Sequence, residues 1–233
     1  MQNFFQRFDP ESSTFTYVLV DAGTRAALLI DSVREQVERD LHLLETHRLR
    51  LEWILETHIH ADHVTGAAQL QTRTGARTAM SARAGVTCAN RLLADGDQIQ
   101  FGDETLRVLA TPGHTAGCLS FLWGDRVFTG DALLIGACGR TDFQEGDPGC
   151  LYDSITQKLL ILPDETLVYP AHDYDGRQVS TIGEQRTTNP RLVGQTRESF
   201  IRLMNGLRLD PPRKIEMALP ANRRCGRQDG AAA

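Results

Sequence analysis

The chain has 233 residues, of which 41% are hydrophobic, and a formal net charge of −5 at pH 7. Such a chain buries a core without cross-links, and we expect one domain over residues 1–227 with a disordered tail over 228–233. The acidic balance argues against nucleic-acid binding as the main role, because phosphate recognition needs a concentrated basic face. No segment resembles a signal peptide or approaches the roughly 20 consecutive apolar residues of a membrane helix. We therefore expect a cytoplasmic protein that does not bind membranes.

The first half of the chain shows strand and helix patterns in alternation. Residues 14–21 and 26–31 are β-rich runs separated by a short turn, which is typical of a hairpin. Apolar residues at helical spacing predict a helix from Arg34 to about His47 and a second one over about 67–74. Between these helices the apolar run 51–58 leads into a cluster of histidines.

The second half continues with strand patterns up to a C-terminal tail. These patterns fall at 99–101, 106–112, 118–124, 126–131 and 167–173. We expect helices over 151–162 and 198–207, followed by a tail rich in proline, arginine and glycine.

Six polar residues each follow a predicted strand, at a loop: His58, His60, His63, His114, Asp131 and His172. Strand ends of one sheet can converge on a single edge, where α/β folds commonly place their sites. We therefore expect these side chains to form one functional site.

The run from His58 to His63 packs three imidazoles and a carboxylate into six consecutive residues. A lone histidine is more often a core or surface residue than a ligand. The density of this run, with His114, Asp131 and His172 behind it, indicates a metal site. Neutral imidazole suits Zn, Fe, Cu and Ni, and an added carboxylate shifts the balance towards harder divalent ions.

The cysteines point away from a thiolate metal site. Five are present with no CxxC pair: Cys88, Cys118, Cys138, Cys150 and Cys225. An odd count in a chain that can fold without cross-links favours five reduced thiols. Clustered zinc-ribbon spacing is also absent, so we expect histidine and carboxylate ligands.

The motifs THIHADH, TPGHT, FTGD and YPAHD resemble those of the metallo-β-lactamase superfamily in type and in order. Within it, the chain resembles the persulfide dioxygenases, also called sulfur dioxygenases or ethylmalonic encephalopathy protein-like enzymes. The supporting segments are TFTYVL, ETHIHADHVTG, GRTDFQEGD, YPAHDYDG, RTTNPRL and PANRRCG. This likeness spans nearly the whole chain. It implies the α/β class and an αβ/βα four-layer sandwich, with the metal site at one edge of the β-sandwich.

The resemblance implies one Fe(II) per chain, held by His58, His114 and Asp131. Two histidines and one carboxylate form the facial triad, which leaves three positions open to water, dioxygen and substrate. Four residues that form the second metal position of dinuclear hydrolase relatives are also present: His60, Asp62, His63 and His172. In a mononuclear enzyme they would instead orient the ligands. Spacing alone leaves both interpretations open.

The resemblance also places three residues near the substrate: Arg140, Tyr174 and Arg191. Glutathione carries two carboxylates, so its pocket needs a guanidinium able to engage carboxylate in a fork geometry. Most arginines of such a chain are solvated, so each assignment rests on the resemblance. Cys138 lies two residues before Arg140 and is as consistent with inert packing as with a redox role.

The implied reaction is the oxidation of glutathione persulfide by O2 and water to sulfite and glutathione. The alternative is a dinuclear glutathione thioester hydrolase of the glyoxalase II type, which uses the same histidine frame. The C-terminal segment is short for the separate helical substrate domain of that hydrolase. A carrier protein with a degenerate site would need a missing ligand, and none is missing. A homodimer and a functional link to a rhodanese are further hypotheses.

Overall fold

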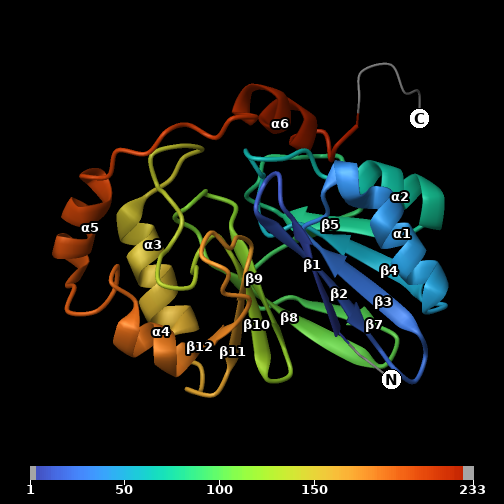
Figure 1. The fold of residues 1–233 in the computed structure, drawn as a ribbon, viewed down its shortest axis with the longest axis horizontal. Coiled ribbons are helices and arrows are strands. Elements are labelled where there is room, and N and C mark those ends of the chain that lie inside the picture. Colours follow the sequence, from blue (N-terminus) through green and yellow to red (C-terminus); the bar gives the residue numbers. More distant parts are fainter. Residues whose placement is uncertain (1–3, 228–233) are drawn as a thin grey trace. The chain divides into compact units, whose positions relative to one another are not determined.

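The structure, a computed structural model, describes residues 4–227, and the predicted disordered tail lies outside them. The chain divides into two compact units. Unit 1 is Met1–Leu93, Ile99–Thr105 and Pro211–Ala233, and unit 2 is Ala94–Gln98 and Leu106–Asp210. Figure 1 labels the helices and strands of both units. The single domain over residues 1–227 stays a prediction.

A six-stranded sheet forms the centre of unit 1. Its strands, in spatial order, are β1 (Phe4–Asp9), β2 (Thr14–Val20), β3 (Ala26–Ile30), β4 (Arg50–Leu55), β5 (Arg77–Ser81) and β6 (Arg91–Leu93). The first three strands pair antiparallel, and β3 to β6 pair parallel. The hairpin predicted from the two β-rich runs is confirmed as β2 and β3.

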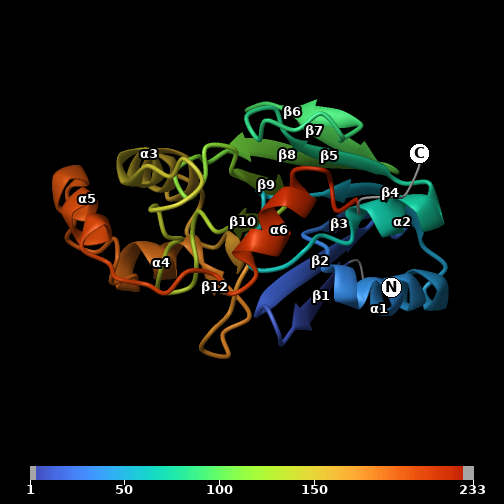
Figure 2. The same ribbon diagram turned by 90° about the horizontal axis from the view of Figure 1, so that it is seen from above.

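Two helices cover one face of this sheet, α1 (Val37–Thr46) and α2 (Ala67–Thr74) (Figures 1 and 2). Their apolar stripes supply part of a buried cluster, and alternate residues of the strands supply the rest. The cluster includes Val37, Leu43, Leu44, Ala67, Leu70, Val18, Val20, Ala27, Leu29 and Ile54. Both predicted helices are confirmed.

The C-terminal part of unit 1 corrects one expectation. We expected only a tail rich in proline, arginine and glycine there, but Ile215–Asn222 forms a helix, α6, with Pro220 inside it. Ala218 and Asn222 of this helix are buried. The proline, arginine and glycine content of the segment obscured its apolar pattern.

Unit 2 is built on five strands of a second, six-stranded sheet, in the order β12-β11-β10-β9-β8. The bounds are β8 (Glu104–Ala110), β9 (Leu119–Trp123), β10 (Arg126–Gly130), β11 (Leu167–Pro170) and β12 (Ser180–Thr181). Only β10 and β11 pair parallel; the other pairs are antiparallel. Strand β7 (Gln98–Phe101) and β8 each include residues of both units.

Helices pack on this sheet through a second apolar cluster. They are α3 (Pro148–Ser154), α4 (Ile182–Thr188) and α5 (Arg197–Asn205), and a π-helical segment (Ile155–Leu159) extends α3. The cluster joins Leu151, Ile155, Leu159, Phe200 and Met204 to Val127 and Val168 of the sheet. The helices predicted over 151–162 and 198–207 are confirmed, whereas β1, β5, β6, β12 and α4 were not predicted.

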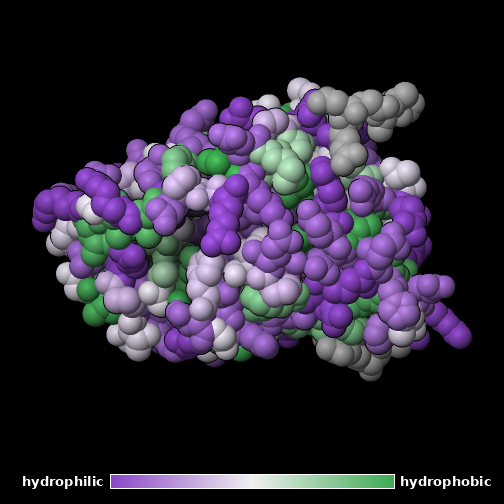
Figure 3. All heavy atoms as spheres, turned by 45° about the horizontal axis from the view of Figure 1, so that its top comes forward, coloured by the Kyte–Doolittle hydropathy of each residue, from purple (hydrophilic) through white to green (hydrophobic). Residues whose placement is uncertain are grey.

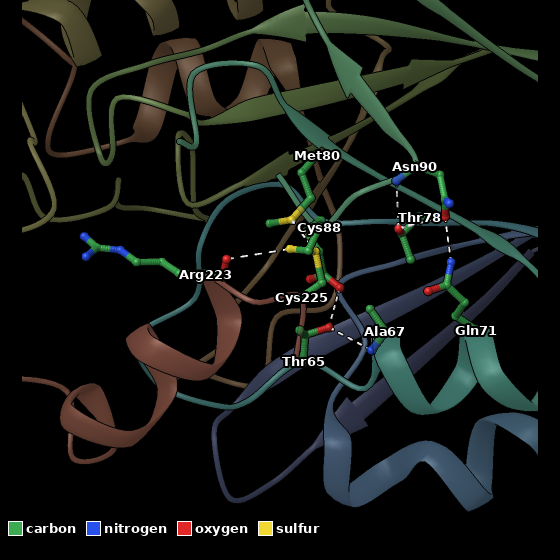
Figure 4. The surroundings of a disulfide bond; sticks show 10 residues. Thr65, Ala67, Gln71, Thr78, Met80, Cys88, Asn90, Arg223 and Cys225 are labelled. Atoms are coloured by element: carbon green, nitrogen blue, oxygen red, sulfur yellow. Dashed lines mark hydrogen bonds between the residues drawn. A yellow bond between two sulfur atoms is a disulfide. The ribbon is translucent and has the colours of Figure 1, made fainter. Parts of the chain in front are cut away.

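The cysteines contradict the prediction of five reduced thiols. Cys88 and Cys225 form a disulfide in unit 1, with their Cα atoms 5.9 Å apart, while Cys118, Cys138 and Cys150 are free. Figure 4 shows the bond with Met80 and Thr65 close by. The two cysteines are 137 residues apart, so only the tertiary placement of the C-terminal segment reveals the pair.

Hydrophilic side chains predominate on the face drawn in Figure 3. Within residues 4–227, none of the helices combines the length and the apolar character that crossing a bilayer requires.

Candidate metal centre

The histidine run lies in unit 1 between β4 and α2, in a segment of residues 56–66 that we call the histidine loop. His58, His60 and His63 are all buried, at 3%, 1% and 0% exposure. The ring of His60 lies 4.1 Å from that of His58 and 4.4 Å from that of His63, centroid to centroid. Buried imidazoles at this density need polar partners, which the loop and its neighbours supply.

Asp31 and Thr57 set the orientation of His58. The Thr57 backbone N–H and hydroxyl both donate to the Asp31 carboxylate, at 2.7 and 2.8 Å. Because the only hydroxyl hydrogen of Thr57 is used there, its oxygen accepts from Nδ1–H of His58 at 3.0 Å. This assigns the proton to Nδ1 and leaves the Nε2 lone pair of His58 able to bind a metal.

His60 faces two buried carboxylates. Its Nε2 lies 3.1 Å from Asp31 Oδ1 and 3.4 Å from Glu56 Oε2. Burial alone would lower the pKa of His60, but the neighbouring carboxylates, Asp31 first, raise that pKa well above its ordinary value. Burial raises the pKa of Glu56, which also accepts a hydrogen bond from Thr65 at 2.5 Å. The Nε2 atom of His60 is therefore directed at carboxylates.

His63 has the opposite arrangement of its two ring nitrogens. Its Nδ1 lies 2.9 Å from Asp62 Oδ2, and Thr14 donates to the same oxygen at 3.0 Å. Its Nε2 is buried, with no hydrogen-bond partner in the described part of the chain. His63 thus presents one unused nitrogen, while Asp62 holds the ring.

The sequence interpretation missed Asp31 and Glu56. Together with His60 they form a fully buried group whose ligand atoms lie within 4.8 Å of one another. A signal for them existed: β3 and β4 are parallel neighbours in which Ile30 pairs with Leu55. The residue after each strand is a carboxylate, so both carboxylates lie at one sheet edge.

Unit 2 brings three of the predicted residues together at strand ends. Asp131 follows β10 and His172 follows β11, which are parallel neighbours, and His114 lies in the loop between β8 and β9. Nε2 of His114 is 3.4 Å from Asp131 Oδ2, and Nε2 of His172 is 3.5 Å from Asp131 Oδ1. The two imidazoles therefore flank one carboxylate.

Main-chain groups hold these residues in place. The carbonyl of Arg140 accepts from His114 Nδ1 at 2.7 Å; a carbonyl can only accept, so the proton is on Nδ1 and the Nε2 lone pair remains. The Gly139 N–H donates to the Asp131 carbonyl at 2.8 Å. A Cβ at Gly139 would lie 2.4 Å from that carbonyl oxygen and 2.9 Å from His114 Cγ. Only glycine allows this approach.

Gly113 has a similar role on the other side of His114. Its φ is +138°, and a Cβ there would lie 2.3 Å from the Leu151 backbone at the start of α3. The glycine of the TPGHT motif thus lets the His114 loop pack directly on the helix.

The Arg140 side chain is engaged within unit 2. Its guanidinium makes a two-point contact with Asp142, both bonds 2.7 Å, and donates to the carbonyls of Leu209 and Asp210 at 3.1 and 2.6 Å. It also lies over the Phe143 ring, 4.2 Å from the centroid. The guanidinium therefore ties its own segment to the end of unit 2.

Within the described part of the chain, the other two predicted substrate residues, Arg191 and Tyr174, lack the network of side-chain hydrogen bonds that Arg140 has. In the described residues the Arg191 side chain has no hydrogen-bond or ion-pair partner, although its main chain donates to Asn189. Tyr174 is 71% exposed and stacks on His172, with ring centroids 5.7 Å apart.

Cys138 is buried, which raises its pKa to about 12, and it contacts Met204. A thiol of that pKa is inert, which favours packing as its role.

The donor types fit a divalent metal ion. The hydrogen bonds at Nδ1 of His58 in unit 1 and of His114 in unit 2 place the proton on Nδ1, so Nε2 is the nitrogen of each ring that carries a lone pair. Asp131 Oδ1 is buried and has no hydrogen-bond partner in the described residues. Imidazole nitrogens and carboxylate oxygens are donors that divalent transition-metal ions accept.

This fold and these donor residues are those of a protein of the metallo-β-lactamase type with candidate metal ligands. The model of the Metallo-beta-lactamase superfamily matches residues 10–172, and the chain belongs to that superfamily. The predicted fold class is therefore confirmed.

Relatives within the superfamily show to which family the chain belongs. The crystal structure of ETHE1 from Myxococcus xanthus is 51% identical, with a TM-score of 0.95 over 97% of this chain and 100% of that one. The mitochondrial persulfide dioxygenase ETHE1 of Homo sapiens is 47% identical over 96% of this chain and 88% of its own length. Glyoxylase B2 of Dictyostelium discoideum is 30% identical over 93% and 88%. The chain belongs to the family of ETHE1 persulfide dioxygenases.

Proposed function

We infer that this chain is a persulfide dioxygenase. The observation that carries the inference is the likeness to ETHE1 proteins over nearly the whole chain, at about half of all positions identical. We propose glutathione persulfide as the substrate. Its oxidation takes up one O2 and one water and yields sulfite, glutathione and two protons, so that all three oxygen atoms end on the outer sulfur.

We propose one Fe(II) per chain, with His58, His114 and Asp131 as its ligands. Iron held by two histidines and a carboxylate keeps positions for outside ligands and supplies the redox chemistry. The direction of His60 Nε2 does not decide the number of metals: Nε2 faces Asp31 and Glu56, but Nδ1 of the same ring has no hydrogen-bond partner among the described residues and lies 3.9 Å from Asp62 Oδ1. The proposal of a single metal therefore rests on the resemblance of the motifs.

The chain's own residues would act by orientation. Asp31, acting through Thr57, fixes the tautomer of His58, and the Arg140 carbonyl fixes that of His114. His172 lies beside Asp131 and restrains its carboxylate. Groups that orient ligands in this way typically contribute 10–100-fold to metal affinity or activity.

For the glutathione part of the substrate we propose Arg191 as a carboxylate partner. Its guanidinium has no partner among the described residues, so no internal ion pair need break when a substrate carboxylate arrives. The exposed ring of Tyr174 offers a contact surface beside His172. The pairing of Arg140 with a glutathione carboxylate stays a prediction. It requires the substrate carboxylate to replace Asp142 as the partner of the guanidinium.

A dinuclear thioester hydrolase is the second candidate. The unused Nε2 of His63 favours it, because that atom is a free ligand next to Asp62. The likeness to Glyoxylase B2 is weaker than that to ETHE1. A cytoplasmic location, a homodimer and a functional link to a rhodanese stay predictions.

The test is oxygen uptake by the iron-loaded protein on glutathione persulfide, with sulfite measured in parallel. We expect one sulfite for each O2 consumed, and loss of both iron and activity in Asp131→Ala. Hydrolysis of a glutathione thioester without oxygen uptake would contradict the inference and favour the hydrolase.

A further inference from the structure

The C-terminal segment of unit 1 contacts the histidine loop through one buried side chain. Asn222, the last residue of α6, is 1% exposed. Its Nδ2 donates to the carbonyls of His60 and His63, both at 2.8 Å, and its Oδ1 accepts from the Thr65 N–H at 2.9 Å. One amide group thus satisfies three main-chain groups of the loop.

Further contacts fix the position of Asn222 itself. Three residues after it, Cys225 is bonded to Cys88, beside Thr65 and Met80 (Figure 4). Cys225 also belongs to an apolar cluster that contains Ile59, the residue between the first two histidines. Arg34 donates to the Gly226 carbonyl at 3.2 Å. The segment is therefore anchored at several points just after Asn222.

We propose that Asn222 is a positioning residue for the metal-binding loop and that the C-terminal segment is its brace. Asp31 restrains the loop at Thr57, and Asn222 restrains it from His60 to Thr65. His58 lies between these two restraints, and His60 and His63 lie within the second one. The PANRRCG motif contains Asn222 and Cys225, the asparagine and the cysteine that hold the loop.

The chemistry of the contact explains why an asparagine is needed. The two carbonyls require N–H donors and the Thr65 N–H requires an acceptor, and a primary amide offers both. Aspartate could still accept from Thr65 but has no donor for the carbonyls of His60 and His63. Alanine leaves all three groups buried without partners, which they can escape only if the loop opens to water.

The first test is hydrogen exchange of the metal-free protein, which does not depend on the proposed function. In Asn222→Ala we expect peptides covering residues 58–65 to exchange at least about tenfold faster than in the parent chain, because local opening exposes their amides. The matched control is Leu44→Ala, which weakens the core of the same unit without removing a contact to the loop. Equal exchange of residues 58–65 in both variants would overturn the proposal.

The second readout uses the iron-loaded protein and rests on the proposed function. Transfer of iron to a chelator should be about 10–100-fold faster in Asn222→Ala than in Leu44→Ala at matched thermal stability. Asn222→Asp should protect the Thr65 amide while the loop still releases iron faster. If the loop exchanges faster in Asn222→Ala but the parent chain binds no iron, the positioning role is kept and the proposed metal is rejected.

A measurement on the unmodified chain covers the case in which the variants fail to fold. If Asn222 holds the loop, the Thr65 amide and the amides of residues 218–226 should open as one unit under native-state exchange. A Thr65 amide that stays protected while residues 218–226 exchange would contradict the brace.

Discussion

The two units hold their histidines by different means. In unit 1, side chains restrain the histidine loop: Asp31 binds Thr57, and Asn222 binds three main-chain groups further along. In unit 2, main-chain groups do so, through the Arg140 carbonyl and the Gly139 amide. A side-chain restraint is lost when one residue is truncated, whereas a main-chain restraint is lost only when the backbone moves. The two units should therefore respond differently to substitution.

The largest effect is expected for Asp31→Ala in unit 1. It removes the acceptor for both Thr57 bonds and leaves His60 without its nearest carboxylate. We expect loss of most bound iron and a fall in kcat/KM of at least about 100-fold, the upper end of effects from groups that orient ligands. Iron per chain and oxygen uptake measure this. Full iron content in the variant would show that Thr57 and His58 keep their orientation without Asp31.

Gly139→Ala is the corresponding change in unit 2. The new Cβ would lie 2.4 Å from the Asp131 carbonyl oxygen, so the backbone must move away from both Asp131 and His114. We expect kcat/KM to fall by about 10–100-fold, with iron bound more weakly. Gly206→Ala, where φ is −82° and the added Cβ would meet the Arg202 and Leu203 carbonyls at 3.4 Å, an ordinary van der Waals distance, is a control for chain folding. Equal activity in the two variants would contradict a main-chain restraint.

Arg140→Gln tests the role of the Arg140 guanidinium separately from that of its main-chain carbonyl. The carbonyl that binds His114 is retained, so iron should stay bound, while the contacts of the guanidinium to Asp142 and Asp210 are lost. We expect a fall in kcat/KM of up to about fivefold, equal for glutathione persulfide and for a small persulfide without carboxylates, because an ion pair with an exposed carboxylate such as Asp142 is worth at most about 1 kcal/mol.

Arg191→Gln should behave differently from Arg140→Gln in the same assay. It should raise KM for glutathione persulfide alone, because a contact made equally in the ground and transition states changes KM and leaves kcat unchanged. If Arg140→Gln instead showed this selective rise, Arg140 would be the carboxylate partner, as the sequence predicted.

The smallest effect is expected for Cys138→Ala. This variant tests whether the Cys138 thiol, two residues before Arg140 in unit 2, takes part in the reaction. The pKa of this thiol is raised to about 12, so it carries no thiolate at neutral pH. We expect kcat to change by less than about twofold, and iodoacetamide to modify the exposed Cys150 first. Loss of oxygen uptake in Cys138→Ala would restore a redox role for Cys138.

The sequence predicted the ligand-bearing residues better than the groups that hold them. His114, Asp131 and His172 were recognised because each follows a strand, and unit 2 brings them together. The restraints were missed for physical reasons. A carbonyl or amide such as that of Arg140 or Gly139 has no signature in residue type.

Long-range side-chain partners were missed for a different reason. Asn222 contacts His60 from 162 positions further along the chain. The Cys88–Cys225 bond likewise joins distant segments, and α6 was hidden by Pro220 and its arginine-rich surroundings. Local pattern predicts strands and helices, but such contacts depend on where the elements pack.

The count of metal ions in fully active protein tests the central claim most directly. Elemental analysis should find about one iron per chain when oxygen uptake on glutathione persulfide is maximal, because the facial triad uses His58, His114 and Asp131 alone. His172→Ala should then lower iron affinity or rate by about 10–100-fold without removing a whole metal equivalent. Two zinc ions per chain in the active protein, one of them lost in His172→Ala, would contradict the mononuclear dioxygenase.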